Sequence, residues 1–223
     1  MVMGYNHSVM SANTPQPDSA EYQFEMTGGA LCLDFVNTVG DRPDPKNEHL
    51  HTYADILSWA RQASILTNDQ VVDLRNYSEQ KSGEADEVFA RAVSLRESLY
   101  NTFAALATGS QPSEREVAVL NRWLAESLAH LRLEESDGDF SWSWSGSDTA
   151  LERMLWPVVR SAGDLLASGE AQQVRECASD SCSWLFVDRS RTHRRRWCDM
   201  KTCGNRAKAR RYYQRKRTSH PSA

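Results

Sequence analysis

Residues 177–206, CASDSCSWLFVDRSRTHRRRWCDMKTCGNR, hold four of the five cysteines of this 223-residue chain. The cysteines form two close pairs in the pattern C-x4-C-x15-C-x4-C, and each pair closes a short loop at low entropic cost. Four thiolates at such spacing are typical of a structural zinc site, in which the protein supplies every ligand. We therefore expect one structural Zn²⁺ with no open position for hydrolytic chemistry, held by Cys177, Cys182, Cys198 and Cys203.

Two other arrangements of these thiols stay open at this stage. The cysteines could form two disulfides or could be unrelated buried thiols, but the first residues do not resemble a secretion signal and disulfides are rare in the cytosol. His193 could replace one cysteine, although a complete set of four leaves it free to face solvent. The fifth cysteine, Cys32, lies in an apolar run and is expected to be a small buried side chain.

A short apolar segment between the two pairs, WLFVD at 184–188, is typical of a strand. Trp184 and Phe186 alternate along it, so their side chains face the same side. A knot of this size is too small to enclose a core of its own. We therefore expect these two rings to form its hydrophobic plug.

Charge divides the chain at about residue 170. Residues 171–223 carry 14 lysines and arginines against 4 aspartates and glutamates, a net charge of +10. The preceding residues carry 12 basic and 26 acidic side chains, a net charge of −14. A segment this basic is expected to bind a polyanion, while the acidic part keeps the protein soluble.

After Cys203 the sequence GNRAKARRYYQRKR lacks proline and is rich in good helix formers, which predicts a helix. Its cations fall on two stripes, which are Arg206, Arg210 and Arg217 on one side and Lys208, Arg211 and Arg215 on the other. Such a helix suits the major groove of duplex DNA, with a phosphate rail on each side. Asn205 and Arg206, near the helix start, are expected to contact bases. The predicted nucleic-acid surface comprises Arg191, Arg194, Arg195, Arg196, Asn205, Arg206, Lys208, Arg210, Arg211 and Arg215.

The acidic part of the chain is predicted to be mostly helical. An apolar run at 30–39 is expected to form a buried strand. Expected helices begin at Thr52, at Thr67 and at a capping box of Ser113 with Glu116, and others cover 84–107 and 148–168, with Pro157 as a kink and Gly169 as a cap. Alternating apolar residues around Asp137-Gly138-Asp139 predict a β-hairpin. The fold class is therefore α+β: a mostly helical N-terminal domain with a small sheet, followed by a small four-cysteine zinc finger that ends in a basic helix.

The C-terminal segment resembles the CGNR zinc finger in Cys177-x4-Cys182, Phe186, Asp188, Ser190, Arg191, Arg196, Trp197, Cys198-x4-Cys203-Gly204-Asn205-Arg206 and Lys208. Residues 28–38, GGALCLDFVNT, are similar to the start of the ABATE domain, which precedes that finger in bacterial proteins. The resemblance implies a stress-induced transcription regulator with a DNA-binding finger and an N-terminal domain that serves as a sensor or for dimerisation. We expect a flexible leader over 1–20, the ABATE-like domain over 21–170, the finger over 171–217 and a flexible tail over 218–223.

Two polar residues, Asp34 and Asn37, interrupt the apolar run at 30–39. Buried side chains of this kind most often satisfy nearby backbone groups. Alternatively, they face a ligand pocket for a small-molecule effector, together with Arg42 in the adjacent loop. Both interpretations stay open at this stage.

Three classes of function compete for this sequence. The first is a cytoplasmic DNA-binding transcriptional regulator, with an effector or a second copy of the chain as further partners. The second is RNA binding, because arginine-rich helices and four-cysteine knots also suit RNA. The third is a small-molecule enzyme whose basic segment localises it, but we expect no enzyme because HExxH, a nucleophile elbow and a glycine-rich phosphate loop are missing. No membrane partner is expected either, since no run of 18 apolar residues occurs.

Overall fold

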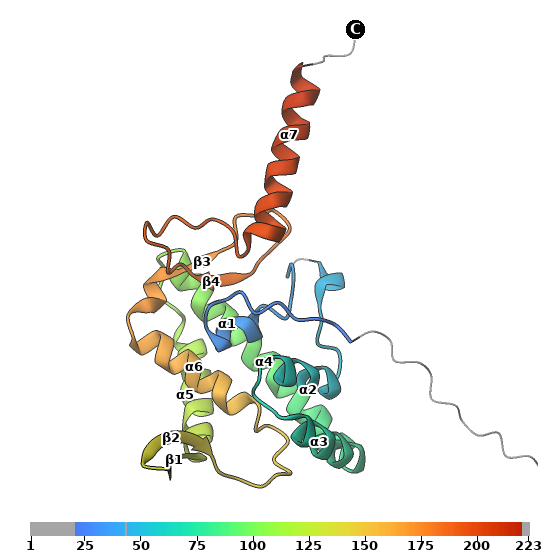
Figure 1. Ribbon diagram of the computed structural model, residues 1–223, viewed down its shortest axis with the longest axis vertical. Coiled ribbons are helices and arrows are strands. Elements are labelled where there is room, and N and C mark those ends of the chain that lie inside the picture. Colours follow the sequence, from blue (N-terminus) through green and yellow to red (C-terminus); the bar gives the residue numbers. More distant parts are fainter. Residues whose placement is uncertain (1–20, 43, 220–223) are drawn as a thin grey trace, which may run out of the picture.

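The computed structural model describes residues 21–42 and 44–219, and the helices that precede residue 170 form a bundle (Figure 1). The helices of the bundle are α1 (Leu31–Val36), α2 (Tyr53–Gln62), α3 (Asn68–Gln80), α4 (Ser82–Ala107), α5 (Glu114–Leu128) and α6 (Leu155–Ala167). The long α4 packs against α1, α2, α3 and α5, and α6 closes the bundle against α1 and α5. The leader expected over 1–20 lies outside the described residues. Among the helices described, none is both long enough and apolar enough to cross a bilayer.

The expected helix starts at Thr52 and Thr67 are confirmed. Each threonine side chain accepts a hydrogen bond from the backbone N–H three residues later, and the side chain of that later residue bonds back to the threonine N–H. Ser113 likewise accepts from the Glu116 amide at the start of α5. These side chains satisfy amides that have no partner within the helix, so they set where α2, α3 and α5 begin.

The last helix of the bundle is shorter than expected. Turns occupy residues 148–154, and α6 begins at Leu155 instead of near 148. Pro157 is therefore the third residue of the helix, where its missing N–H removes no helical hydrogen bond, and the expected kink within a longer helix does not arise. Gly169 follows the helix with φ of +78°, which confirms it as the residue that ends α6.

The expected strand at 30–39 is wrong, because residues Leu31–Val36 form the short helix α1. Cys32, Leu33, Phe35 and Val36 are all fully buried, as is typical of an element enclosed on every side. A continuous apolar run of this length fits a buried strand or a buried helix equally well. Packing against α4 and α6 decides in favour of the helix.

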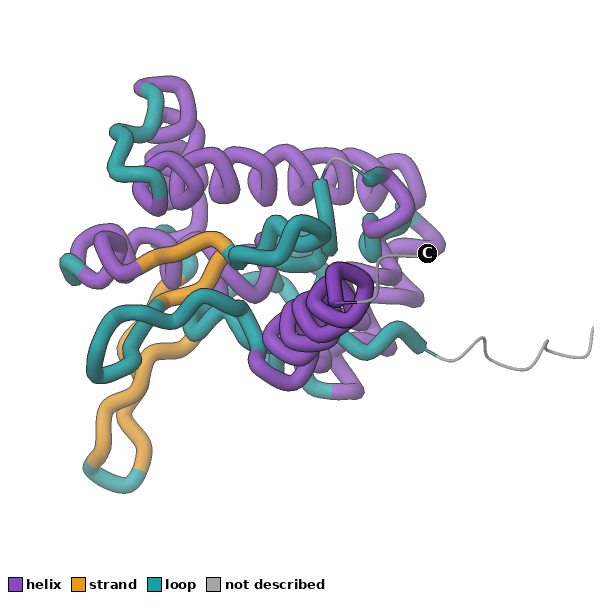
Figure 2. The backbone as a smooth tube through the Cα atoms, turned by 90° about the horizontal axis from the view of Figure 1, so that it is seen from above, coloured by secondary structure: helices purple, strands orange, loops and turns teal. Residues whose placement is uncertain are grey.

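The expected β-hairpin is confirmed as β1 (Leu131–Ser136) and β2 (Asp139–Trp144), which pair antiparallel. Asp137 and Gly138 join them with φ of 53° and 88°, the left-handed pair that a two-residue hairpin turn requires. The hairpin lies at the end of the bundle opposite to the C-terminal helix (Figure 1) and extends sideways from the helices (Figure 2). Its apolar side chains Leu133, Phe140 and Trp142 are more than half exposed.

In the segment expected to form the finger, residues 171–217, the 3-10 turn η2 (Glu170–Gln173) leads into the hairpin of β3 (Val174–Glu176) and β4 (Leu185–Val187). A π-helical turn, η3 (Met200–Gly204), leads into the basic helix α7 (Asn205–Ser219), which projects away from the bundle (Figure 1). α7 continues two residues past the expected end of the finger. Val174, Leu185 and Val187 belong to the same core as the helices. The finger is therefore built onto the bundle and does not form a separate body.

Candidate metal centre and nucleic-acid interface

The four cysteines of the finger come together as expected. Their sulfur atoms all lie within 4.8 Å of one another, and the Sγ of Cys198 lies 3.8 Å from that of Cys182 and 3.6 Å from that of Cys203. Four sulfurs at 2.3 Å from a zinc ion in a tetrahedron stand about 3.8 Å apart, whereas disulfide sulfurs stand about 2.05 Å apart. The donor set and its geometry therefore fit one Zn²⁺ and not two disulfides.

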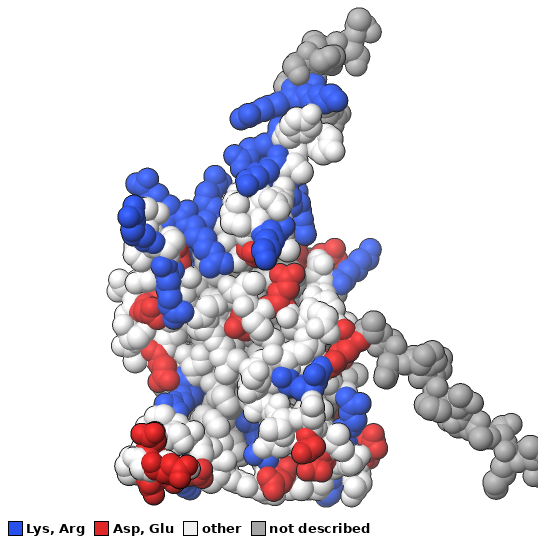
Figure 3. Space-filling view, viewed as in Figure 1, with Lys and Arg blue, Asp and Glu red and all other residues white. Residues whose placement is uncertain are grey.

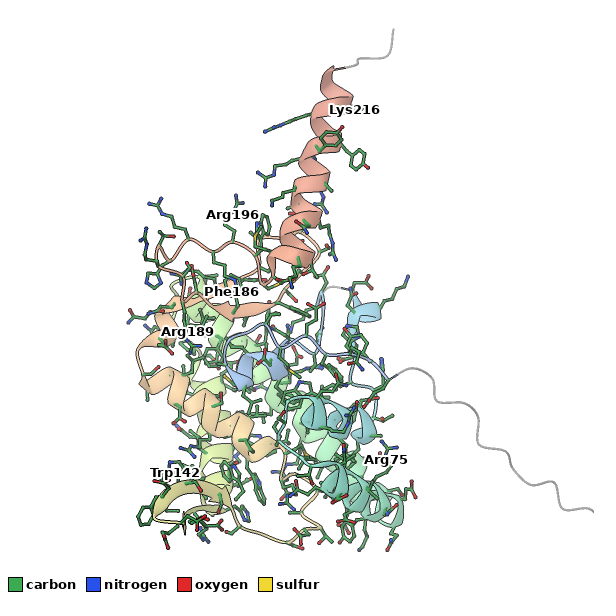
Figure 4. The ribbon with its side chains drawn as sticks, in the orientation of Figure 1. Arg75, Trp142, Phe186, Arg189, Arg196 and Lys216 are labelled. Atoms are coloured by element: carbon green, nitrogen blue, oxygen red, sulfur yellow. The ribbon has the colours of Figure 1, made fainter. Side chains whose placement is uncertain are left out.

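Aromatic side chains enclose this centre. Phe186 is fully buried against the cysteines, and Trp184 and Trp197 pack around them, which confirms the expected hydrophobic plug. The indole N–H of Trp184 donates to the carbonyl of Val39 at 2.8 Å, so the plug is also tied to the helical domain. Figure 4 shows Phe186 beneath the loop that carries Arg196.

A buried carboxylate organises the basic loop between the two cysteine pairs. Asp188 is fully buried and accepts hydrogen bonds from the amides of Ser190, at 3.0 Å, and Arg195, at 2.8 Å. His193 Nδ1 lies 2.9 Å from the carbonyl of Asp188, so this ring is part of the loop and not of the metal site. Arg195 donates to the carbonyls of Trp197 and Cys198 and lies 4.4 Å above the Phe186 ring. Its guanidinium therefore braces the loop from within.

The CGNR motif is itself largely structural. Cys203 is a metal ligand, and a Cβ on Gly204 would lie 2.8 Å from the end of the Met200 side chain, so a larger residue there would require that side chain to move. Asn205 Nδ2 donates to the carbonyl of Lys201 at 3.1 Å, and Arg206 donates to Ser181 Oγ at 3.1 Å. The motif thus joins α7 to both cysteine pairs. The side chains of Asn205 and Arg206, the two expected base readers, donate hydrogen bonds to other residues of the protein.

The other predicted nucleic-acid residues gather on one end of the molecule. Figure 3 shows lysines and arginines clustered over α7 and the adjoining loop, while acidic side chains are scattered over the rest of this face. The exposed cations of this end include Arg191, Arg194, Arg196, Arg206, Lys208, Arg210, Arg211 and Arg215. The side chain of Arg217, placed on one stripe from the sequence, lies outside the described residues.

Sequence reasoning did not assign a role to two aromatic residues of α7. Tyr212 and Tyr213 are 63% and 64% exposed, and their rings meet edge to face at 5.7 Å. Adjacent exposed tyrosines on a basic helix offer flat surfaces to a ligand. The sequence YY between RR and QRKR was the available signal.

Asp34 and Asn37 bond to backbone groups, whereas Arg42 lines a cavity with other residues. Asp34 accepts a hydrogen bond from the Gly28 amide at 2.8 Å, and burial raises its pKa to about 6. Both polar atoms of the Asn37 side chain bond to the backbone of Leu185 in β4, each at 2.9 Å. The structure therefore gives Asp34 and Asn37 backbone partners, as expected from the interpretation that such buried polar side chains satisfy backbone groups.

Arg42 lies farther along, in the loop after α1. It pairs with Glu97 at 3.0 Å, donates to the carbonyl of Val36 at 2.8 Å and lies 3.6 Å above the ring of Tyr100. It lines a cavity of about 460 Å³ together with Val39, Asp44, Glu48, His51, Arg96 and Glu97. The mixed charges of this lining do not single out a class of ligand.

The residues around α1 form a joint that receives the outer edge of β4. Gly28 accepts a hydrogen bond from the Val187 amide at 2.9 Å, and the Asn37 side chain pairs with Leu185 two residues earlier. Gly29, at φ of +78°, accepts from Arg189 Nη1 at 2.7 Å. We call this contact the α1–β4 joint. Sequence reasoning missed it, although the glycine pair and the two polar residues in an apolar run were its signal.

Comparison with known families matches two successive segments of the chain. The family model for ABATE, described as "Putative stress-induced transcription regulator", matches residues 29–169, and that for the CGNR zinc finger matches residues 173–216. Neither description is that of an enzyme. A search of curated proteins gave no match. With the sulfur geometry, these matches identify the four cysteines as ligands of one structural zinc ion.

Proposed function

The chain belongs to the ABATE family and ends in a CGNR zinc finger, and from this premise we propose that it is a zinc-dependent, DNA-binding transcriptional regulator. One observation carries the proposal: a basic helix projects from a metal-stiffened base, clear of the acidic domain (Figures 1 and 3). In this proposal α7 contacts DNA, and the N-terminal domain senses an effector or dimerises.

The dimensions and charge of α7 suit a DNA groove. The helix has 15 residues, so it is about 22 Å long, and the major groove of B-form DNA is about 12 Å wide and admits a helix. Exposed cations of the two stripes, such as Arg210 on one side and Lys208 on the other, lie where a phosphate rail would pass on either side of an inserted helix. The net charge of −14 on residues 1–170 makes that part of the chain an unsuitable second clamp for phosphates.

RNA is a second candidate, favoured by one observation. Tyr212 and Tyr213 are exposed on α7, and aromatic side chains stack on unpaired bases, which are more common in structured RNA than in a DNA duplex. A groove-bound helix would instead place these rings against the sugar–phosphate backbone. Measuring affinity for a random duplex and for a structured RNA at the same salt concentration separates the two candidates.

Selection of bound sequences from a random duplex pool, with the zinc-loaded full chain, tests the function. We expect an enriched motif and, for about five phosphate contacts, a slope of log K against log salt near −4 to −5. Lys208→Ala should weaken binding of all sequences and reduce this slope by about 1, because it removes one phosphate contact. Arg75→Ala, on the exposed surface of α3 far from α7, is the matched control and should bind normally (Figure 4). Salt-independent binding, or no preference for duplex DNA, would contradict the proposal.

A further inference from the structure

A cavity of about 190 Å³ lies between the first turns of α7 and the loop that joins Cys177 to Cys182. Four arginines line it, which are Arg196, Arg206, Arg210 and Arg211. Among the described residues of the lining, Asp180 supplies the one carboxylate. The cavity thus collects more positive charge than the protein itself neutralises.

Asp180 pairs with one of these arginines. Its carboxylate accepts a hydrogen bond from Arg210 Nη1, across the gap between the loop and the helix. Arg206, one turn earlier on the same face of α7, donates to Ser181 Oγ at 3.1 Å. The side chains of Asp180 and Arg210 are 80% and 47% exposed, so solvent screens the pair and a stronger anion can displace Asp180.

Carboxylate and phosphate make the same kind of contact with arginine. Each presents two oxygens in a plane, which the guanidinium fork binds with two parallel N–H···O hydrogen bonds. A phosphodiester that entered the cavity would meet Arg210 where Asp180 now meets it, with three further arginines among the lining residues. The exposure of Asp180 leaves it room to turn away into solvent.

Building on the DNA-binding function proposed above, we propose that this cavity is the seat of one backbone phosphate of duplex DNA and that Asp180 occupies Arg210 until DNA binds. The ion pair is then a built-in competitor. The Asp180–Arg210 pair lowers the affinity for any duplex, because breaking it costs free energy that offsets part of the gain from the phosphate contact. The pair also holds the Arg210 guanidinium in the orientation that the phosphate requires. Exchange of one anion for another leaves Arg210 paired in both states.

Asp180→Asn in the zinc-loaded full chain tests this seat, with binding to a fixed duplex measured at several salt concentrations. We expect affinity to rise about two- to fivefold at low salt, the range of an exposed ion pair, with the gain shrinking as salt rises. Glu79→Gln is the matched control, since it removes one negative charge from the exposed surface of α3 and should leave affinity unchanged. In an Arg210→Ala background the Asp180→Asn gain should disappear. Unchanged zinc content and circular dichroism establish that each variant is folded.

Each other outcome overturns a defined part of the proposal. A gain equal to that of Glu79→Gln, or one that persists without Arg210, would mean that net charge alone is responsible. Weaker binding by Asp180→Asn would mean that Asp180 positions α7 and does not compete with phosphate. Wild-type protein that binds no duplex would instead refute the proposed function, and a gain seen only with structured RNA would assign the seat to RNA.

Discussion

Replacing Asn37 by alanine should destabilise the whole protein, because its side chain stands in for a neighbouring strand at the edge of β4. Oδ1 accepts from the amide of Leu185 and Nδ2 donates to the carbonyl of the same residue, both at 2.9 Å. Asn37 is 3% exposed and Leu185 is fully buried, so water does not replace these hydrogen bonds. The substitution leaves one donor and one acceptor unpaired in the interior.

The magnitude follows from the two orphaned groups. An unpaired buried backbone group costs about 1–3 kcal/mol, so with two such groups Asn37→Ala should lower the free energy of unfolding by about 2–6 kcal/mol. This is a large fraction of the roughly 5–15 kcal/mol that stabilises a typical domain. Asn37→Asp should be at least as harmful, because it places a carboxylate against the carbonyl of Leu185.

Urea unfolding of the zinc-loaded protein, followed by circular dichroism, measures the effect. Asn121→Ala, on the exposed surface of α5, is the matched control and should change stability by no more than about 0.5 kcal/mol. Zinc transfer to a chelator should also be faster for Asn37→Ala, since β4 lies between Cys182 and Cys198. If Asn37→Ala matched the control in both measurements, the α1–β4 joint would contribute nothing to the free energy of unfolding, and the reasoning would be refuted.

Two further predictions concern the metal and pH. Cys198→Ser should release zinc and also lower the midpoint of urea unfolding of the helical domain, because Leu185 and Val187 of β4 lie in the shared core. An unchanged midpoint would show that the finger and the helical domain unfold as independent units. The raised pKa of Asp34, about 6 against 3.8 when unfolded, means that the folded state holds a proton that the unfolded state loses between these values. Its contribution to stability is therefore fully present below about pH 4 and is lost as the pH rises to about 6, by up to about 3 kcal/mol. Asp34→Asn should remove this loss, so the difference in unfolding free energy between variant and wild type should grow from about pH 4 to about pH 7, and a constant difference would contradict the assignment.

Local signals predicted much of the fold. The helix starts at Thr52 and Thr67 follow from side chains that bond to amides three residues away, and the Asp137-Gly138 turn follows from its backbone requirements. The zinc ligands follow from short loops that the chain closes by itself. Each of these depends on residues close in sequence, which is why the sequence alone suffices.

The errors lie where distant segments meet. The apolar run at 30–39 predicts a strand as readily as a helix, because a fully enclosed helix shows no polar face, and only packing against α4 and α6 distinguishes the two. The division near residue 170 follows charge, and the two family matches also divide the chain there, but charge reports on the surface and does not predict that Val174 and β4 share the core of the bundle. The partner of Asn37 is 148 residues away, so no local pattern identifies it.

This shared core changes how the opposite charges of the two parts can act. The net charges of −14 and +10 suggest that the acidic domain competes with nucleic acid for the basic helix. The α1–β4 joint, however, fixes the base of the finger, and α7 projects from there away from the bundle (Figure 1). Attraction between exposed charges fades over about 8–10 Å at ordinary salt, so the acidic bundle acts weakly on the outer turns of α7. Competition within the chain is strongest at the base of the helix, where Asp180 of the finger itself already pairs with Arg210. Cutting the chain at residue 171 would remove the residues around α1 that hold β4, together with the acidic charge. Asp180→Asn changes the charge and leaves the α1–β4 joint in place.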